Sequence, residues 1–212
     1  MKKIFLLVMA VLLSVSVQAK TLRDLWLSMP DSLLPTLNKN LRLEFMDLVD
    51  MQVKPEVKNL LGEECLMDSL ASDFLKVTTS SSAKIQMGLL NQTSGDSVLC
   101  VVRTYSAPEK ESEVKFYNQQ WQELPSKNFF SSEVWQLGKF LKEKSDTLSE
   151  GKYRELISSI EPFMLSAELS MNDNSVIFKV SVPLVSVEDK TDIEALLMQR
   201  KFKWDGERFN EV

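Results

Sequence analysis

The spacing of apolar residues changes along this chain, and each spacing predicts a different kind of structure. Between Leu41 and Val49, apolar residues recur at intervals of three and four with charged residues between them, which predicts an amphipathic helix. After Pro55, a turn at 57–61 that ends at Gly62 and a segment at 65–70 continue the helical pattern. From Asp73 onward the spacing becomes two, which is typical of strands joined by short polar turns. We expect these strands at 74–78, 83–87, 97–105 and 114–121.

The second half of the chain predicts further helices and one more set of strands. Helices are expected at 133–143, at 153–160 before Pro162, and at 189–199. Strands at 163–171 and 175–182 form one hairpin, and 201–212 forms another. The fold class is therefore α+β, an antiparallel β-sheet with packed helices.

The domain prediction is a single α+β domain at 20–212, with sub-units at 20–125 and 126–212 as an alternative. Both halves contain an aromatic residue, a turn and a second aromatic residue, at 116–121 and around 204–207. This layout is expected of two diverged β-rich repeats, but unrelated β-hairpins with flanking aromatic residues also produce it.

The first nineteen residues have the pattern of a signal peptide. Lys2 and Lys3 precede an apolar run at 4–13, and small residues lead to a cleavage position after Ala19. We expect an exported protein, periplasmic or extracellular after cleavage. No later stretch reaches the roughly 20 apolar residues that a transmembrane helix needs.

The composition limits the kinds of catalysis, metal binding and partner that the chain can have. The chain contains no histidine, which excludes Ser-His-Asp and Cys-His catalysis and the usual zinc sites. The net charge is −5 and becomes more negative once Lys2 and Lys3 are removed, so a nucleic acid is not an expected partner. No metal or cofactor is predicted. The expected partner is an unidentified protein or glycan.

Two cysteines, Cys65 and Cys100, allow two interpretations. In an exported protein they could form one disulfide. Cys100 also shares the apolar parity of Val98 and Val102 in a predicted strand, which is typical of a small buried residue.

Several segments of the chain resemble a known family. They are LWLSMPDSLLP at 25–35, NKNLRLE at 38–44, NLLG at 59–62, VVRTY at 101–105 and WQELP at 121–125. In this order they resemble a family of short secreted bacterial proteins that is classed as a domain of unknown function. The resemblance covers most of the chain after the signal peptide and implies no catalytic residue, ligand or partner.

Acidic residues on the first predicted helix suggest one enzymatic alternative. Glu44, Asp47 and Asp50 lie three residues apart, and paired carboxylates hydrolyse glycosides when a cleft holds them about 5 to 9.5 Å apart. The same residues are also what the solvated face of an amphipathic helix contains.

Four tripeptides combine aspartate, serine or threonine, and an apolar residue, a pattern used for O-glycosylation in some Gram-negative envelopes. The candidate acceptors are Ser32, Ser69, Ser97 and Thr147. Helix caps and turns use the same residue types, so a structural role is the alternative.

Leu25, Trp26 and Leu27 lie in an apolar segment interrupted by prolines, and they are the candidate binding residues. This segment either covers the sheet or docks on another protein. The predicted function is a non-catalytic envelope module that binds a protein or a glycan, through a sheet face or this segment. A carboxylate-based hydrolase acting on an envelope or extracellular glycan is the alternative.

Overall fold

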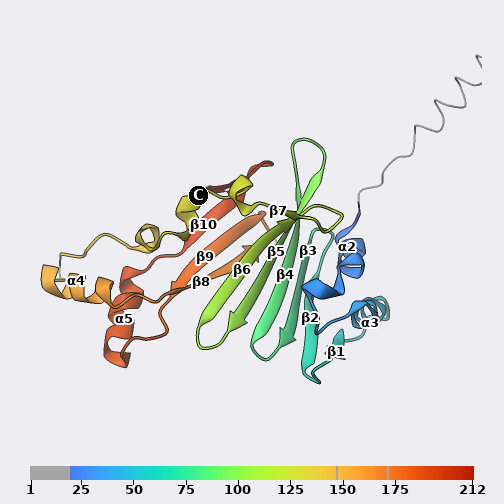
Figure 1. Cartoon of the computed structure of the whole chain (residues 1–212), viewed down its shortest axis with the longest axis horizontal. Coiled ribbons are helices and arrows are strands. Elements are labelled where there is room, and N and C mark those ends of the chain that lie inside the picture. Colours follow the sequence, from blue (N-terminus) through green and yellow to red (C-terminus); the bar gives the residue numbers. More distant parts are fainter. Residues whose placement is uncertain (1–19, 147, 171) are drawn as a thin grey trace, which may run out of the picture.

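The computed structural model describes residues 20–146, 148–170 and 172–212, so the predicted signal peptide lies outside the described residues. Within them the chain forms two antiparallel sheets and four α-helices (Figure 1), which confirms the predicted α+β class. The first sheet runs in the order β1 Glu56–Lys58, β2 Glu64–Leu70, β3 Phe74–Ser80, β4 Ala83–Asn91, β5 Ser97–Ser106, β6 Lys110–Tyr117 and β7 Glu123–Leu124. The second runs in the order β11 Phe209–Glu211, β10 Arg200–Trp204, β9 Ser175–Ser181 and β8 Met164–Ser170. The helices are α2 Leu22–Ser28, α3 Lys39–Asp50, α4 Glu150–Ser158 and α5 Val187–Leu196.

Side-chain caps begin the two N-terminal helices. Thr21 and Asp24 form a capping box at the start of α2, each side chain bonding the backbone N–H of the other. Asn38 accepts a hydrogen bond from the backbone N–H of Leu41 and so begins α3. In both helices a polar N-cap residue therefore directly precedes the helical segment that carries the buried apolar residues.

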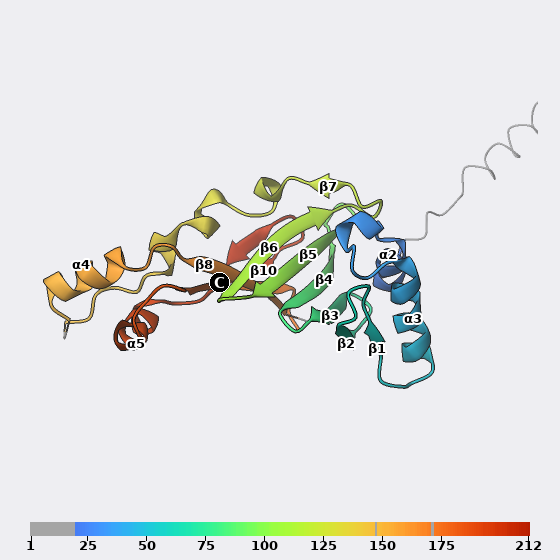
Figure 2. The same ribbon diagram turned by 60° about the horizontal axis from the view of Figure 1, so that its bottom comes forward.

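The seven-stranded sheet packs against an apolar core on each of its two faces (Figure 2). Strand β5 shows this division, because Leu99 and Val101 belong to the core beneath α2 and α3, whereas Val98, Cys100 and Val102 face the second sheet. The molecule thus has three layers, helices on sheet on sheet.

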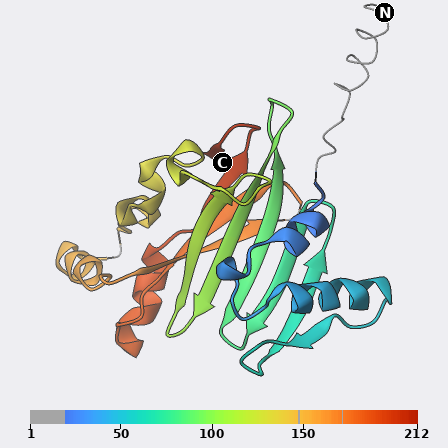
Figure 3. The same cartoon turned by 45° about the vertical axis from the view of Figure 1, so that its right-hand side comes forward.

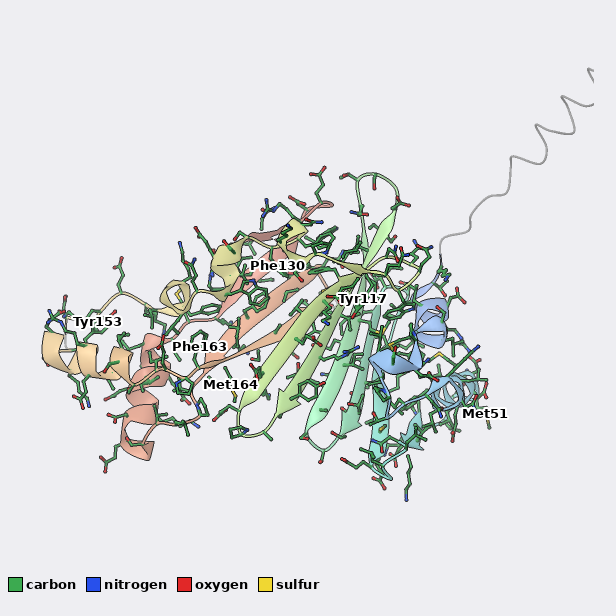
Figure 4. All side chains as sticks on the ribbon, in the orientation of Figure 1. Met51, Tyr117, Phe130, Tyr153, Phe163 and Met164 are labelled. Atoms are coloured by element: carbon green, nitrogen blue, oxygen red, sulfur yellow. The ribbon has the colours of Figure 1, made fainter. Side chains whose placement is uncertain are left out.

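Aromatic side chains fill the space between the two sheets. Phe130, labelled in Figure 4, stacks on Phe209 with ring centroids 4.8 Å apart and contacts Phe178 and Phe202 edge to face. Such ring pairs stabilise a core beyond the area that they bury.

Strand β8 is the edge of the second sheet, and side chains of the first sheet bond its free backbone. The amide of Gln86 bonds both the N–H and the C=O of Leu169, each at 3.4 Å. The hydroxyl of Ser112 accepts from the N–H of Ala167 at 2.9 Å. Polar groups buried between the sheets are therefore satisfied, and the edge strand is covered.

A third, smaller apolar cluster lies at one end of the second sheet, where Val180 of β9 packs against it. Helices α4 and α5 enclose it with residues such as Leu156, Ile160 and Ile193, and they form the arm at one end of Figure 1. No described helix is long and apolar enough to span a bilayer.

Two predicted helical regions are wrong. The segments 57–61 and 65–70 contribute to strands β1 and β2, which pair with each other and bury Val57, Cys65 and Met67. The sequence did not show the alternation of a strand, because Leu66, which lies between the buried Cys65 and Met67, is also apolar. The turn at Gly62 is confirmed, since Gly62 adopts a positive φ of 82°.

The helix predicted at 133–143 is also wrong. Two short 3-10 helices, Ser132–Trp135 and Leu137–Phe140, replace it because Gln136 between them has extended backbone. The next residues pair with the chain that follows α5, through bonds from Met198 N–H to Phe140 C=O and from Lys142 N–H to Leu196 C=O, both 2.8 Å. Tertiary pairing therefore overrides the helical spacing.

Candidate functional site

The segment predicted to bind a partner lies in the core. Leu25 and Trp26 are 0% exposed, and Leu27 packs partly buried against the same cluster. The indole N–H of Trp26 donates to the carbonyl of Arg42 at 3.3 Å, so even its polar atom is used inside the fold. Docking through Trp26 is thus incorrect, and the segment covers the sheet, which was the other interpretation.

Arg42 holds this segment in place. Its guanidinium, 0% exposed, donates to the carbonyls of Trp26 at 3.1 Å and Leu37 at 2.6 Å and to that of Met29, and it pairs with Asp31 at 3.0 Å. Arg42 lies off the apolar stripe of the predicted helix, yet it is buried because three carbonyls at the ends of short elements need a donor. Arg42 is therefore structural.

The three carboxylates of the enzymatic alternative lie exposed on α3. Asp50 bonds Arg23 in a two-pronged ion pair, and the hydrogen bond from Arg23 lowers the pKa of that carboxyl. A general acid needs the opposite shift. Glu44 and Asp47 are exposed beside Asp50. None of the three carboxylates lines the polar cleft that is described below.

The glycosylation candidates differ in exposure. Ser32 is exposed in a 3-10 turn, Asp31–Leu33, whereas Ser69 and Ser97 are half-buried in strands β2 and β5. The hydroxyl of Ser97 also donates to the Asn91 side chain at 3.1 Å. Thr147 lies outside the described residues. Modification of any of these positions stays a prediction.

A disulfide between Cys65 and Cys100 is not formed, because both are free, buried thiols. Cys65 faces the helices and Cys100 faces the second sheet. Their strands are three spacings apart, about 14 Å, whereas a disulfide requires Cα atoms within about 7 Å. The interpretation as small buried residues is the one that the structure supports.

A polar cleft of about 400 Å³ lies where two loops meet at one end of the first sheet. One loop is the β4–β5 hairpin, the green loop that projects beyond the strands in Figure 3, and the other is the turn between β6 and β7. Val98 and Leu124 form the apolar part of the wall. The polar part is made by Gln92, Asp96, Ser97, Asn118, Gln119 and Gln120.

Hydrogen bonds from other segments hold one wall of this cleft. The indole of Trp204 donates to the carbonyl of Asn91 at 2.8 Å, and the N–H of Thr93 donates to the carbonyl of Gly206 at 3.0 Å. The β4–β5 hairpin is thus fixed by the β10–β11 hairpin, although about 110 residues separate them in sequence.

The other wall is held by the Asn118 side chain. Its oxygen accepts from the N–H groups of Gln120 at 2.9 Å and Gln122 at 3.0 Å, which closes the turn. Gln119 binds Lys20 at the start of the described chain, through its side chain at 3.2 Å and its carbonyl at 3.1 Å. The cleft is therefore formed by loops that the fold positions before any ligand arrives.

The cleft can offer hydrogen bonds but little charge. Amide side chains both donate and accept, and Asp96 is the one ionisable residue among its lining groups. A polar turn was expected between the strands at 83–87 and 97–105, and 116–121 was described both as part of a strand and as a turn between two aromatic residues. Nothing in the sequence brought these two segments together. The polar run Asn118-Gln119-Gln120 was the signal that could have found it.

Known proteins agree with this fold without assigning an activity. A domain of an uncharacterized protein from Porphyromonas gingivalis W83 has a TM-score of 0.75 at 23% identity, covering 90% of this chain and 98% of that chain. No curated protein matches. Residues 14–209 match the family described as "Protein of unknown function (DUF3256)", and the chain therefore belongs to this family.

Proposed function

We propose that this protein is a non-catalytic binding module that takes a neutral carbohydrate in the polar cleft. The single observation that carries the proposal is the preformed cleft with six amide, hydroxyl and carboxyl side chains in its lining. The predicted signal peptide supports a location outside the cytoplasm, where envelope and extracellular glycans are found.

The lining chemistry favours a sugar over a charged ligand. A sugar hydroxyl both donates and accepts a hydrogen bond, which is the capacity of the Gln92 and Gln120 amides. Leu124, which is half-buried, supplies apolar surface for the C–H face of a sugar ring. A volume of about 400 Å³ lies within the range of small-molecule sites.

The lining also supports binding without hydrolysis. Glycoside hydrolysis usually needs two carboxylates, one on each side of the scissile bond. Asp96 is the one carboxylate among the lining residues, so a bound sugar would meet no acid and base pair there.

An array of neutral oligosaccharides, probed with the labelled protein, tests the proposal. We expect binding to a related group of structures, lost or strongly weakened in Gln92→Ala and Gln120→Ala. Gln136→Ala is the matched control, because Gln136 is exposed on another segment. Asp96→Asn should keep binding, and the bound oligosaccharide should be recovered intact. No binding, or equal binding by the cleft variants and the control, would overturn the proposal.

A further inference from the structure

Two residues on the helix-facing side of β5 and β6 carry polar atoms without a partner. Among the residues that the structure describes, the buried side-chain atoms lacking a hydrogen bond are Arg103 Nε, Arg103 Nη2 and the Tyr117 hydroxyl. Buried polar groups are nearly always hydrogen-bonded, and an unpaired one destabilises the fold. Three such donors on one pair of strands therefore call for a shared acceptor.

The free edge of Arg103 has a defined shape. Its Nη1 donates to Glu113 at 3.4 Å, which leaves the opposite edge, Nε and Nη2, unused. Two parallel N–H groups on one edge of a guanidinium match the two oxygens of a carboxylate. The side chain is 16% exposed, so solvent reaches part of this residue.

Tyr117 lies on the same face, further along the sheet. Arg103 is opposite Glu113, and Tyr117 is four residues further along β6, about 13 Å away at the backbone. Two long side chains can span that interval. Burial raises the pKa of Tyr117, while the positive charges of Arg103 and Lys115 oppose this rise. Figure 4 shows Tyr117 on the seven-stranded sheet.

Lys115 lies between these two residues and is already neutralised. Its ammonium pairs with Glu113 at 3.1 Å and with Glu123 at 3.3 Å. The two cations and two carboxylates of this face thus balance. Glu113 and Glu123 repel a singly charged planar anion less than a doubly charged phosphate, so this face favours the singly charged ligand of the two.

We infer that the Nε and Nη2 edge of Arg103 and the hydroxyl of Tyr117 bind a carboxylate group of a small-molecule ligand. Arg103 supplies two parallel hydrogen bonds and Tyr117 donates a third. Lys115, whose side chain is 33% exposed, is the flexible group that moves aside to admit the ligand. This site is distinct from the polar cleft and does not depend on it.

NMR titration of the protein with sodium acetate tests the inference, because the Nε–H of Arg103 gives its own signal. We expect that signal to move and saturate with acetate. Sodium chloride at the same ionic strength should not reproduce the movement, and inorganic phosphate should bind more weakly than acetate. If acetate and chloride have equal effects, water satisfies these donors and the inference fails. Tighter binding of phosphate would overturn the assignment to a carboxylate.

Two variants test the paired N–H donors of Arg103 and the Tyr117 hydroxyl separately from the positive charge of Arg103. Arg103→Lys keeps the charge but loses the paired donors together with the Nε–H signal, so the backbone amide signals of residues 103 and 117 report on both variants. Arg103→Lys should abolish saturable binding, while Arg208→Lys, at an exposed position, should leave it unchanged. Tyr117→Phe keeps the ring and should weaken acetate binding about fivefold, as expected for one lost hydrogen bond. If Arg103→Lys does not fold, the Tyr117→Phe result and the wild-type signal decide. Unchanged binding in Tyr117→Phe would overturn the role of the hydroxyl.

Discussion

Replacing Arg42 should destabilise the protein more than its position on a charged helix suggests. Arg42→Met keeps the length of the side chain but removes the donors to the carbonyls of Trp26, Met29 and Leu37. It also removes a guanidinium that lies 6.0 Å from the centre of the Trp26 ring. The carbonyls of Met29 and Leu37 lose this donor, whereas that of Trp26 still accepts from the N–H of Met29 at 3.4 Å; the lost bonds are the main physical cost.

The magnitude follows from the burial of this site. A buried carbonyl that loses its donor costs about 1 to 3 kcal/mol, so the losses at Met29 and Leu37 together should cost about 2 to 6 kcal/mol, a large part of the 5 to 15 kcal/mol that stabilises a typical domain. Asp31→Asn removes the charge of the ion-pair partner, but Asp31 is 56% exposed. Its loss should cost less than about 1 kcal/mol.

Urea unfolding, followed by tryptophan fluorescence and circular dichroism, measures both variants. We expect Arg42→Met to lower the midpoint strongly with little change in the slope, and Asp31→Asn to lower it slightly. Amide hydrogen exchange should show protection lost first at 21–35, the segment that Arg42 holds. If Arg42→Met stays within about 1 kcal/mol of the wild type, the structural role assigned to Arg42 is wrong.

Three further predictions concern other parts of the molecule. Gly206 has a φ of +103° and a Cβ there would lie 2.8 Å from a side-chain carbon of the β4–β5 hairpin, so Gly206→Ala should cost about 1 to 3 kcal/mol and weaken carbohydrate binding. Gly138→Ala, with open space around it, is the control in the same unfolding and binding assays. Burial raises the pKa of the Cys100 thiol, so a thiol reagent should modify it only after unfolding; rapid modification of the native protein would contradict its burial. The hydrogen bond from Lys201 holds the pKa of Asp173 well below its usual range, so this stabilisation is present above about pH 4 and is lost as the pH falls further. Asp173→Asn should therefore be less stable than the wild type at pH 7, and acid unfolding curves should show that difference shrinking below about pH 4.

The strands were predictable where one parity is strongly apolar. From 74 to 105 each strand carries apolar residues at alternate positions, and the turns between them contain glycine, serine or aspartate. Hairpins of this kind are specified by residues close in sequence, and the three strands begin where they were predicted to begin, although β4 continues to Asn91, four residues beyond its predicted end. The pairing of 65–70 was hidden because both parities there contain apolar residues.

The candidate sites were less accessible to prediction because they depend on distant segments. The sequence around Arg42, which is buried, does not distinguish it from Asp47, which is exposed on the same helix. The polar cleft needs two turns to meet, and the free edge of Arg103 depends on how Glu113 is placed opposite it. Trp26 was ambiguous for the same reason, since its burial is decided by what packs above the sheet.

The bonds that Gln86 and Ser112 make to β8 have a consequence for how the chain is made. The first sheet joins strands that are neighbours in sequence, so it can form early during synthesis, whereas β8 is made about 80 residues after Gln86. Until β8 to β11 have been synthesised, the apolar face that carries Phe116 and Val102 is exposed to solvent. A partly synthesised chain is therefore the stage most prone to aggregation, and a chaperone that holds it would act on this face.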